Sequence, residues 1–156
     1  MAYRDSQPKT IYLQDYRDPE FLIEKTVLTI EVGKDITRVE SVLTMSRNPA
    51  ASAPESRLQL NVVDLAVVSL AVDDVVLSES DYFLSGENLC VEKPVPDKFQ
   101  FKSVVNIKPQ ENTSLEGIYK SRELFCSQCE AEGFRKITFY LDRPDVMAEF
   151  TTTIIA

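Results

Sequence analysis

The sequence predicts an all-β domain, and three observations favour that fold class. Val, Ile and Thr supply 35 of the 156 residues whereas Ala supplies only 9, and β-branched side chains suit a pleated, half-buried surface better than a helix. Several segments alternate apolar and polar residues, and no long window has helical periodicity. Turn-forming residues recur about every 8–12 positions, which is typical of a sandwich or a similarly curved antiparallel sheet.

The segment from Phe99 to Ile107 is the clearest strand. Its odd-numbered residues, four apolar side chains and Ser103, share one face, while lysines lie on the other face. Leu28, Ile30 and Val32 share a face in the same way. Weaker patterns predict strands at residues 38–46, 57–60, 67–72, 82–84, 89–92, 136–141 and 148–155.

The chain contains no internal repeat, low-complexity tract or linker, so we expect one domain spanning residues 1–156. Residues 49–55 are a loop by composition. The chain stops at residue 156 within a good strand pattern, and two interpretations stay open. The domain ends natively in a strand, or the sequence is a segment of a longer protein.

The net charge of −8 and the pI near 4.6 argue against nucleic acid or an anionic membrane surface as a partner. The N-terminus lacks an apolar core of signal-peptide length, and no run of 18 apolar residues occurs. We therefore expect a soluble, cytoplasmic chain. The sequence has no histidine, which excludes Ser-His-Asp and Cys-His catalysis and every His-containing metal site within this chain.

The sequence has three cysteines, Cys90, Cys126 and Cys129. This count is low and odd, which argues against a secreted disulfide framework. Cys126 and Cys129 form a C-x-x-C, which could be half a zinc site or a redox pair. A structural zinc site needs four ligands, and without histidine only Cys90 could add a third. The redox interpretation needs a βαβ context that this sequence lacks. We therefore expect structural or incidental thiols and no metal site.

Residues 128–135 place an amide and two carboxylates close together. If this segment is extended, Gln128, Glu130 and Glu132 project to one side and could bind a cation such as an ammonium. Spacing alone favours an ordinary solvated face, and the paired carboxylates of a glycosidase would require a cleft that sequence cannot establish. Asp142-Arg143-Pro144-Asp145 is typical of a turn, and residues 109–117 form a long polar loop.

Two longer segments carry a specific pattern: Asn112-Thr113-Ser114-Leu115-Glu116-Gly117-Ile118-Tyr119-Lys120-Ser121 and Cys126-Ser127-Gln128-Cys129-Glu130-Ala131-Glu132-Gly133-Phe134-Arg135-Lys136-Ile137-Thr138-Phe139-Tyr140-Leu141-Asp142-Arg143-Pro144-Asp145-Val146-Met147-Ala148. Together they closely resemble the end of the N-terminal domain in the bacterial aminopeptidase N family, zinc-dependent alanyl aminopeptidases of the gluzincin class. Tyr16-Arg17-Asp18-Pro19-Glu20-Phe21 is similar to the family's opening. The resemblance covers essentially the whole chain but only the first part of the enzyme.

This resemblance implies a saddle-like, largely antiparallel β-sandwich-type domain that covers the active site of a thermolysin-like catalytic domain. That catalytic domain would supply the Gly-Ala-Met-Glu-Asn motif and the H-E-x-x-H zinc helix, and neither occurs in these 156 residues. The implied partners are peptide substrates and the enzyme's own catalytic domain. The implied cofactor is zinc in the full-length enzyme, with none bound by this fragment, which alone should be inactive.

The resemblance also implies two substrate-binding residues. Glu130 corresponds to the acidic residue that holds the α-ammonium group of the substrate, and Gln128 to a residue lining the pocket for the first side chain. One departure is that residues 122–124, Arg-Glu-Leu, stand where the family commonly has glycine. Because these residues disfavour positive φ, we expect the loop before Cys126 to differ in shape.

A stand-alone β-sandwich module that binds peptide or carbohydrate is the alternative. It would require exposed aromatic residues aligned on one face, yet the sequence has no Trp and its Phe and Tyr residues mostly fit the inward alternation. The two hypotheses make different predictions. The aminopeptidase hypothesis places Glu130 and Gln128 at an exposed edge beside an apolar surface, whereas a Glu130 buried in a salt bridge would contradict it.

Overall fold

The computed structural model describes residues 10, 12–51 and 57–156, and in this part of the chain β-strands dominate. The largest sheet has six strands. In spatial order they are β11 (Glu149–Ile155), β1 (Phe21–Val32), β2 (Thr37–Arg47), β8 (Lys98–Ile107), β4 (Ala66–Val72) and β5 (Val75–Val76). β11 and β1 are parallel, and all other neighbours are antiparallel. The predicted all-β, largely antiparallel fold class is therefore confirmed.

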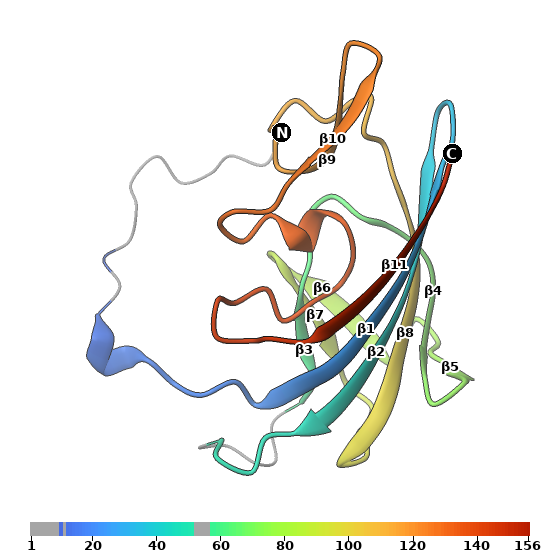
Figure 1. Ribbon diagram of the computed structural model, residues 1–156. Helices are drawn as coiled ribbons and strands as arrows, with labels where there is room; N and C mark the ends of the chain where they lie inside the picture. The colour runs from blue at the N-terminus through green and yellow to red at the C-terminus, as the bar shows by residue number, and fades with distance from the viewer. Residues whose placement is uncertain (1–9, 11, 52–56) are drawn as a thin grey trace.

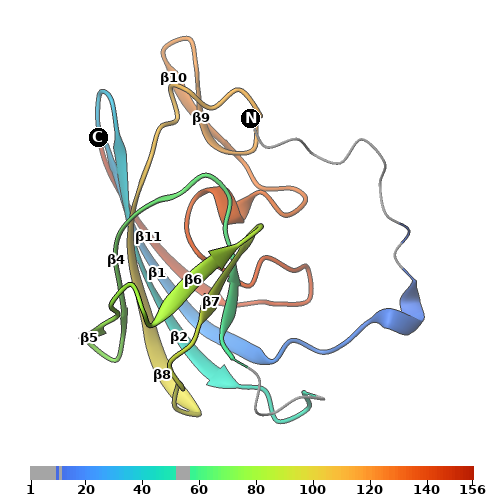
Figure 2. The same ribbon diagram turned by 180° about the vertical axis from the view of Figure 1, so that it is seen from behind.

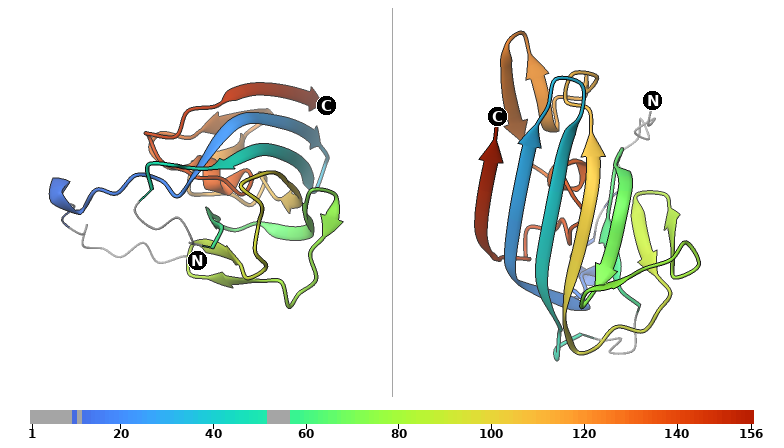
Figure 3. Two further views of the ribbon diagram at one scale, coloured as in Figure 1. Left: turned by 90° about the horizontal axis from the view of Figure 1, so that it is seen from below. Right: turned by 90° about the vertical axis from the view of Figure 1, so that its right-hand side faces the viewer.

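A smaller sheet faces the concave side of the large one (Figure 3). It consists of β3 (Gln59–Asn61), β7 (Asn88–Val91) and β6 (Tyr82–Ser85), which crosses in front of the large sheet in Figure 2. A separate hairpin of β9 (Gly117–Ser121) and β10 (Leu124–Gln128) stands at one end of the molecule (Figure 1). Two short 3-10 helices, η1 (Leu13–Asp15) and η2 (Phe134–Lys136), complete the elements in the described residues.

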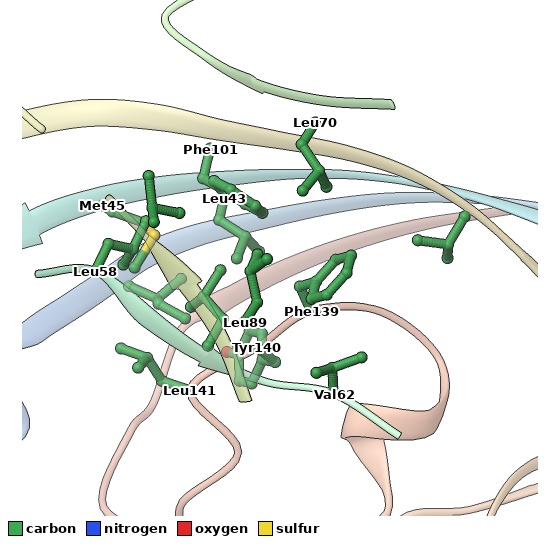
Figure 4. Packing of buried hydrophobic residues seen from close by; sticks show 14 of the residues in the cluster. Leu43, Met45, Leu58, Val62, Leu70, Leu89, Phe101, Phe139, Tyr140 and Leu141 are labelled. Carbon is green, nitrogen blue, oxygen red and sulfur yellow. The ribbon is translucent and has the colours of Figure 1, made fainter. Parts of the chain in front are cut away.

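The hydrophobic core fills the space between the two facing sheets (Figure 4). Leu43, Met45 and Phe101 of the large sheet point toward Leu58 and Leu89 on the other side, and all five are buried. Burial of one such side chain contributes about 1.5–3 kcal/mol. The described part of the chain contains no helix that is long and apolar enough to cross a membrane.

β8 confirms the clearest strand prediction, because its five odd-numbered residues are all buried. The predicted face of Leu28, Ile30 and Val32 also points inward, but β1 begins earlier, at Phe21. A bulge between Ile23 and Lys25 explains the difference. Odd-numbered residues face the core before the bulge and even-numbered ones after it, so no single period of two runs through the strand.

The predicted strand at residues 136–141 is wrong. Lys136 ends η2, and residues 137–141 form irregular chain with one isolated bridge, between Tyr140 and Asn61. All five residues from 137 to 141 are buried between the sheets, so the apolar run reflects burial on every side rather than a pleated strand. Residues 49–51 lie in a loop, as predicted, and residues 52–55 of that predicted loop lie outside the described residues.

Candidate functional site

The loop at residues 128–133, here named the site loop, connects the β9–β10 hairpin to η2 (Figure 1). Gln128 is the last residue of β10, and residues 130–133 form consecutive turns. Glu132 has a φ of 67°, which an extended strand does not adopt. The extended arrangement that would align Gln128, Glu130 and Glu132 is therefore not formed. Gln128 and Glu130 are nevertheless both exposed.

Two glycines let the site loop pack against its neighbours. The N–H of Gly133 donates to the carbonyl of Cys129 at 2.9 Å, and a Cβ at Gly133 would lie 2.8 Å from the carbonyl oxygen of Gln128. Gly117, which pairs with Gln128, has a φ of 72°, and a Cβ there would lie 2.7 Å from Cβ of Lys136. Larger residues at either position would separate the hairpin, the site loop and η2.

Arg135 lies next to the site loop at the centre of an ion-pair network. Its Nη2 is 3.2 Å from Glu132 Oε2, its Nη1 is 3.2 Å from Glu87 Oε2, and its Nε is 3.0 Å from Asp142 Oδ2. Its backbone N–H also donates to Asp142 Oδ2, at 3.1 Å. Burial works to lower the pKa of Arg135, but the hydrogen bond and charge of Asp142, with those of Glu132 and Glu87, raise it overall.

The two carboxylates of the site loop have different surroundings. Glu132 forms an ion pair with Arg135. Among the residues that the structure describes, no side chain forms a hydrogen bond or ion pair with the carboxylate of Glu130 or the amide of Gln128. Glu130 is therefore the site-loop carboxylate that remains available to an external cation, and Gln128 offers an amide beside it.

The Asp142–Asp145 turn is the predicted turn, and it binds the segment near the N-terminus. Arg143 donates to both carboxylate oxygens of Asp145, from Nε at 2.9 Å and Nη2 at 2.7 Å, and to the carbonyl of Arg17 at 2.8 Å. Tyr16 Oη donates to Asp145 Oδ2 at 2.8 Å. The hydrogen bonds from Arg143 hold the pKa of Asp145 below its usual value, and the bond to Asp145 raises the pKa of Tyr16.

The polar loop before β9 is also fixed to the site. Asn112 Nδ2 donates to the carbonyls of Glu116 and Ile118, at 2.7 and 2.9 Å. Lys136 Nζ lies 2.9 Å from Ser114 Oγ and 3.4 Å from Glu116 Oε2. The two segments that carry the family resemblance are thus packed against each other.

Exposed apolar side chains lie on the β9–β10 hairpin and in the loop that precedes it. Leu124 and Phe125 are exposed on β10, and Leu115 is exposed in the loop before β9. Other exposed aromatic side chains, Tyr12, Tyr16, Phe83 and Phe150, lie on elements away from this hairpin, and no described strand carries two of the exposed aromatics. The aligned aromatic face that a carbohydrate-binding module would need is therefore not formed by the described residues.

The cysteines have no arrangement for redox or metal chemistry. Cys126 lies in β10 and Cys129 directly follows it, so three residues of extended chain separate their Cα atoms by about 10 Å, beyond the reach of a disulfide. Burial raises the pKa of the Cys129 thiol. The described residues contain no cluster of three Cys, Asp or Glu side chains that could hold a metal ion. With no histidine in the sequence, these residues do not fit zinc.

The turn between β9 and β10 has a residue in the left-handed region. Arg122 and Glu123 form a two-residue connection, and Arg122 has a φ of 56° although its residue type disfavours positive φ. A two-residue hairpin connection favours this conformation, and the expected difference in loop shape from the family stays a prediction. Sequence reasoning missed Arg135, whose partners Glu87 and Asp142 come from other turns with no spacing pattern that links them.

Comparison with known proteins decides the family. The family described as the peptidase M1 N-terminal domain matches residues 28–156. The chain belongs to this family. Relatives with the M1 N-terminal domain include aminopeptidase N of Escherichia coli (strain K12), 43% identical over 150 residues, and aminopeptidase N of Caulobacter vibrioides, 39% identical over 153 residues. These matches cover 96% and 98% of this chain but only 17% of each relative.

Solved structures agree with this assignment. Aminopeptidase A of Legionella pneumophila, solved in complex with aspartic acid, matches 92% of this chain and 17% of its own, with a TM-score of 0.84 and 29% identity. An M1 zinc metallopeptidase of Deinococcus radiodurans matches with a TM-score of 0.70 and 18% identity, covering 88% of this chain and 33% of its own. The latter likeness concerns the fold alone. The M1 N-terminal domain thus spans a small part of the relatives it matches.

Proposed function

We propose that residues 1–156 are the N-terminal domain of a zinc-dependent aminopeptidase, a hydrolase that releases single N-terminal residues from peptides. Family membership and the 37–43% identity to proteins named aminopeptidase N support this proposal. Zinc would be bound by the catalytic domain, because the described residues of this chain do not fit the metal. The free thiols of Cys90, Cys126 and Cys129 suit a reducing compartment, and we propose the cytoplasm.

Within that enzyme, Glu130 binds the α-ammonium group of the peptide substrate and Gln128 lines the pocket for its first side chain. The observation that carries this proposal is the exposed Glu130 carboxylate, unpaired within the described residues, on a loop whose other carboxylate is ion-paired with Arg135. A charge-assisted hydrogen bond to an ammonium contributes roughly 1.5–3 kcal/mol. Fixing the ammonium at Glu130 leaves only the first peptide bond within reach of a catalytic centre next to it.

The partner that completes this site is the enzyme's own catalytic domain, and the N-terminal domain covers the active site. The exposed side chains of Leu115, Leu124 and Phe125, on the hairpin and in the loop that precedes it, support this arrangement. They would be shielded from water once a second surface packs against this end of the molecule. Peptide substrates would then enter between the two domains.

Substitution of Glu130 in the full-length protein tests this function. We expect Glu130→Ala to raise KM and lower kcat/KM at least tenfold for an alanine arylamide, because the ammonium loses its anchor. Glu123→Gln is the matched control, since this exposed carboxylate lies on the same hairpin and only approaches Lys120, at 3.9 Å. An unchanged kcat/KM in Glu130→Ala would refute the ammonium role.

A further inference from the structure

We propose that Arg135 is a positioning residue for the substrate ammonium. Through Glu132 it holds the site loop in the conformation that presents Glu130, two residues earlier in the chain. This inference rests on the proposed function of Glu130 and adds a residue that does not itself contact the substrate.

The structure gives the guanidinium of Arg135 three carboxylate partners from three segments. Glu132 belongs to the site loop, Glu87 to the turn between β6 and β7, and Asp142 to the turn that follows the buried segment 137–141. Arg135 Nη2 also donates to the carbonyl of Asp142 at 3.1 Å, and the carbonyl of Arg135 accepts the N–H of Val63 at 3.0 Å. Only 12% of the Arg135 side chain is exposed, so this residue is fixed to the core side of the loop.

The ends of the site loop are held by other contacts. Gln128 pairs with Gly117 in the hairpin. The N–H of Gly133 donates a hydrogen bond to the carbonyl of Cys129, and Gly133 packs against the backbone of Gln128. Between these ends, the ion pair between Glu132 and Arg135 ties a charged side chain of the loop to the rest of the domain. Loss of that ion pair should therefore release the middle of the loop, where Glu130 lies, and leave its ends in place.

An arginine suits this position because one planar guanidinium can donate in several fixed directions at once. A lysine has a single ammonium and cannot reproduce donation to Asp142, Glu87 and Glu132 together. The neighbouring carboxylates also keep the pKa of Arg135 raised, so the guanidinium stays charged over the pH range in which an enzyme is assayed.

A purely structural role for Arg135 is the competing explanation, and the network contains a matched pair that separates the two. Glu132 and Glu87 each approach Arg135 at 3.2 Å, with side chains that are 54% and 57% exposed. Exposed ion pairs of this kind contribute about 0–1 kcal/mol to stability. Glu132→Gln and Glu87→Gln should therefore fold equally well, while only Glu132→Gln changes the site loop.

The experiment uses the full-length protein and two readouts. The first is KM and kcat for an alanine arylamide. The second is the ratio of inhibition constants for 3-phenylpropionate and L-phenylalanine, which differ by the ammonium group alone. We expect Glu132→Gln to raise KM at least fivefold with kcat changed less than twofold, and to lower the inhibition ratio at least threefold. Glu87→Gln should leave all three values within twofold of the parent protein.

Arg135→Lys provides a second variant, with the same expected direction as Glu132→Gln and a folded state checked by circular dichroism. Equal effects of Glu132→Gln and Glu87→Gln, or no change in the inhibition ratio in Glu132→Gln, would overturn the positioning role. Glu130→Gln, measured in parallel, separates this failure from that of the proposed function. Glu130→Gln should remove the preference for L-phenylalanine over 3-phenylpropionate. If it does and Glu132→Gln leaves the inhibition ratio unchanged, the proposed role of Glu130 stands and only the role of Arg135 is wrong.

Discussion

Asp145 is one of the residues that connect the segment around Tyr16 to the rest of the described chain. It accepts hydrogen bonds from Arg143 and Tyr16, and both favour its ionised form. The folded-state pKa of Asp145 is therefore depressed. Its contribution to stability is fully present above the unfolded-state pKa and is lost as pH falls through the folded-state pKa.

We therefore expect Asp145→Asn to lower the free energy of unfolding at neutral pH by about 0.5–1 kcal/mol, the value of an exposed ion pair. The difference from the parent protein should shrink as pH falls below the ordinary range of Asp. Denaturant unfolding at a series of pH values measures it. Asp18→Asn is the control, because Asp18 accepts only a long hydrogen bond of 3.4 Å from Tyr16. A pH-independent loss in Asp145→Asn would contradict this assignment.

At the site, the family resemblance predicts that Gln128 and Glu130 bind substrate, and the structure leaves both side chains exposed. Nothing in the spacing could show that Glu132 pairs with Arg135, because Arg135 is oriented by Glu87 and Asp142 from other turns. Contacts of this kind depend on tertiary packing, which local periodicity does not encode.

At the scale of elements, the β9–β10 hairpin has a strained turn that offers a direct test. A non-glycine residue in the left-handed region costs about 1–2 kcal/mol, and Arg122 has a φ of 56°. We expect Arg122→Gly to raise the free energy of unfolding by about 0.5–1 kcal/mol, whereas Arg122→Ala should leave it nearly unchanged. Chemical denaturation measures both. A less stable Arg122→Gly would show that this turn carries no strain.

The strands could be predicted where one face alone is buried. β8 has such a face along its whole length, so a simple alternation located it. β1 could be predicted only after its bulge. For residues 136–141 the sequence predicts a strand, because an apolar run has no periodicity that distinguishes a buried strand from buried irregular chain. The strands β9 and β10 were missed because most of their side chains are exposed or half-buried, which leaves no alternation in the sequence.

At the scale of the whole molecule, we propose that the 156-residue chain does not hydrolyse peptides by itself. It has no histidine, and the described residues contain no cluster that could hold a metal. We expect the 156-residue chain to show no hydrolysis of an alanine arylamide with added zinc, while the full-length protein is active under the same conditions. Measurable turnover by the 156-residue chain would contradict the proposed division of labour between domains.

The buried segment that follows η2 has a consequence for how tightly the site can bind. Thr138 shares a 3.2 Å hydrogen bond with Ser103 at the centre of β8, and Phe139 packs edge-on against Phe101. Residues only a few positions after the site loop are therefore part of the hydrophobic core. If Glu130 binds the substrate ammonium as proposed, a loop anchored in this way would lose little conformational entropy on binding, and most of the interaction free energy would remain available as affinity.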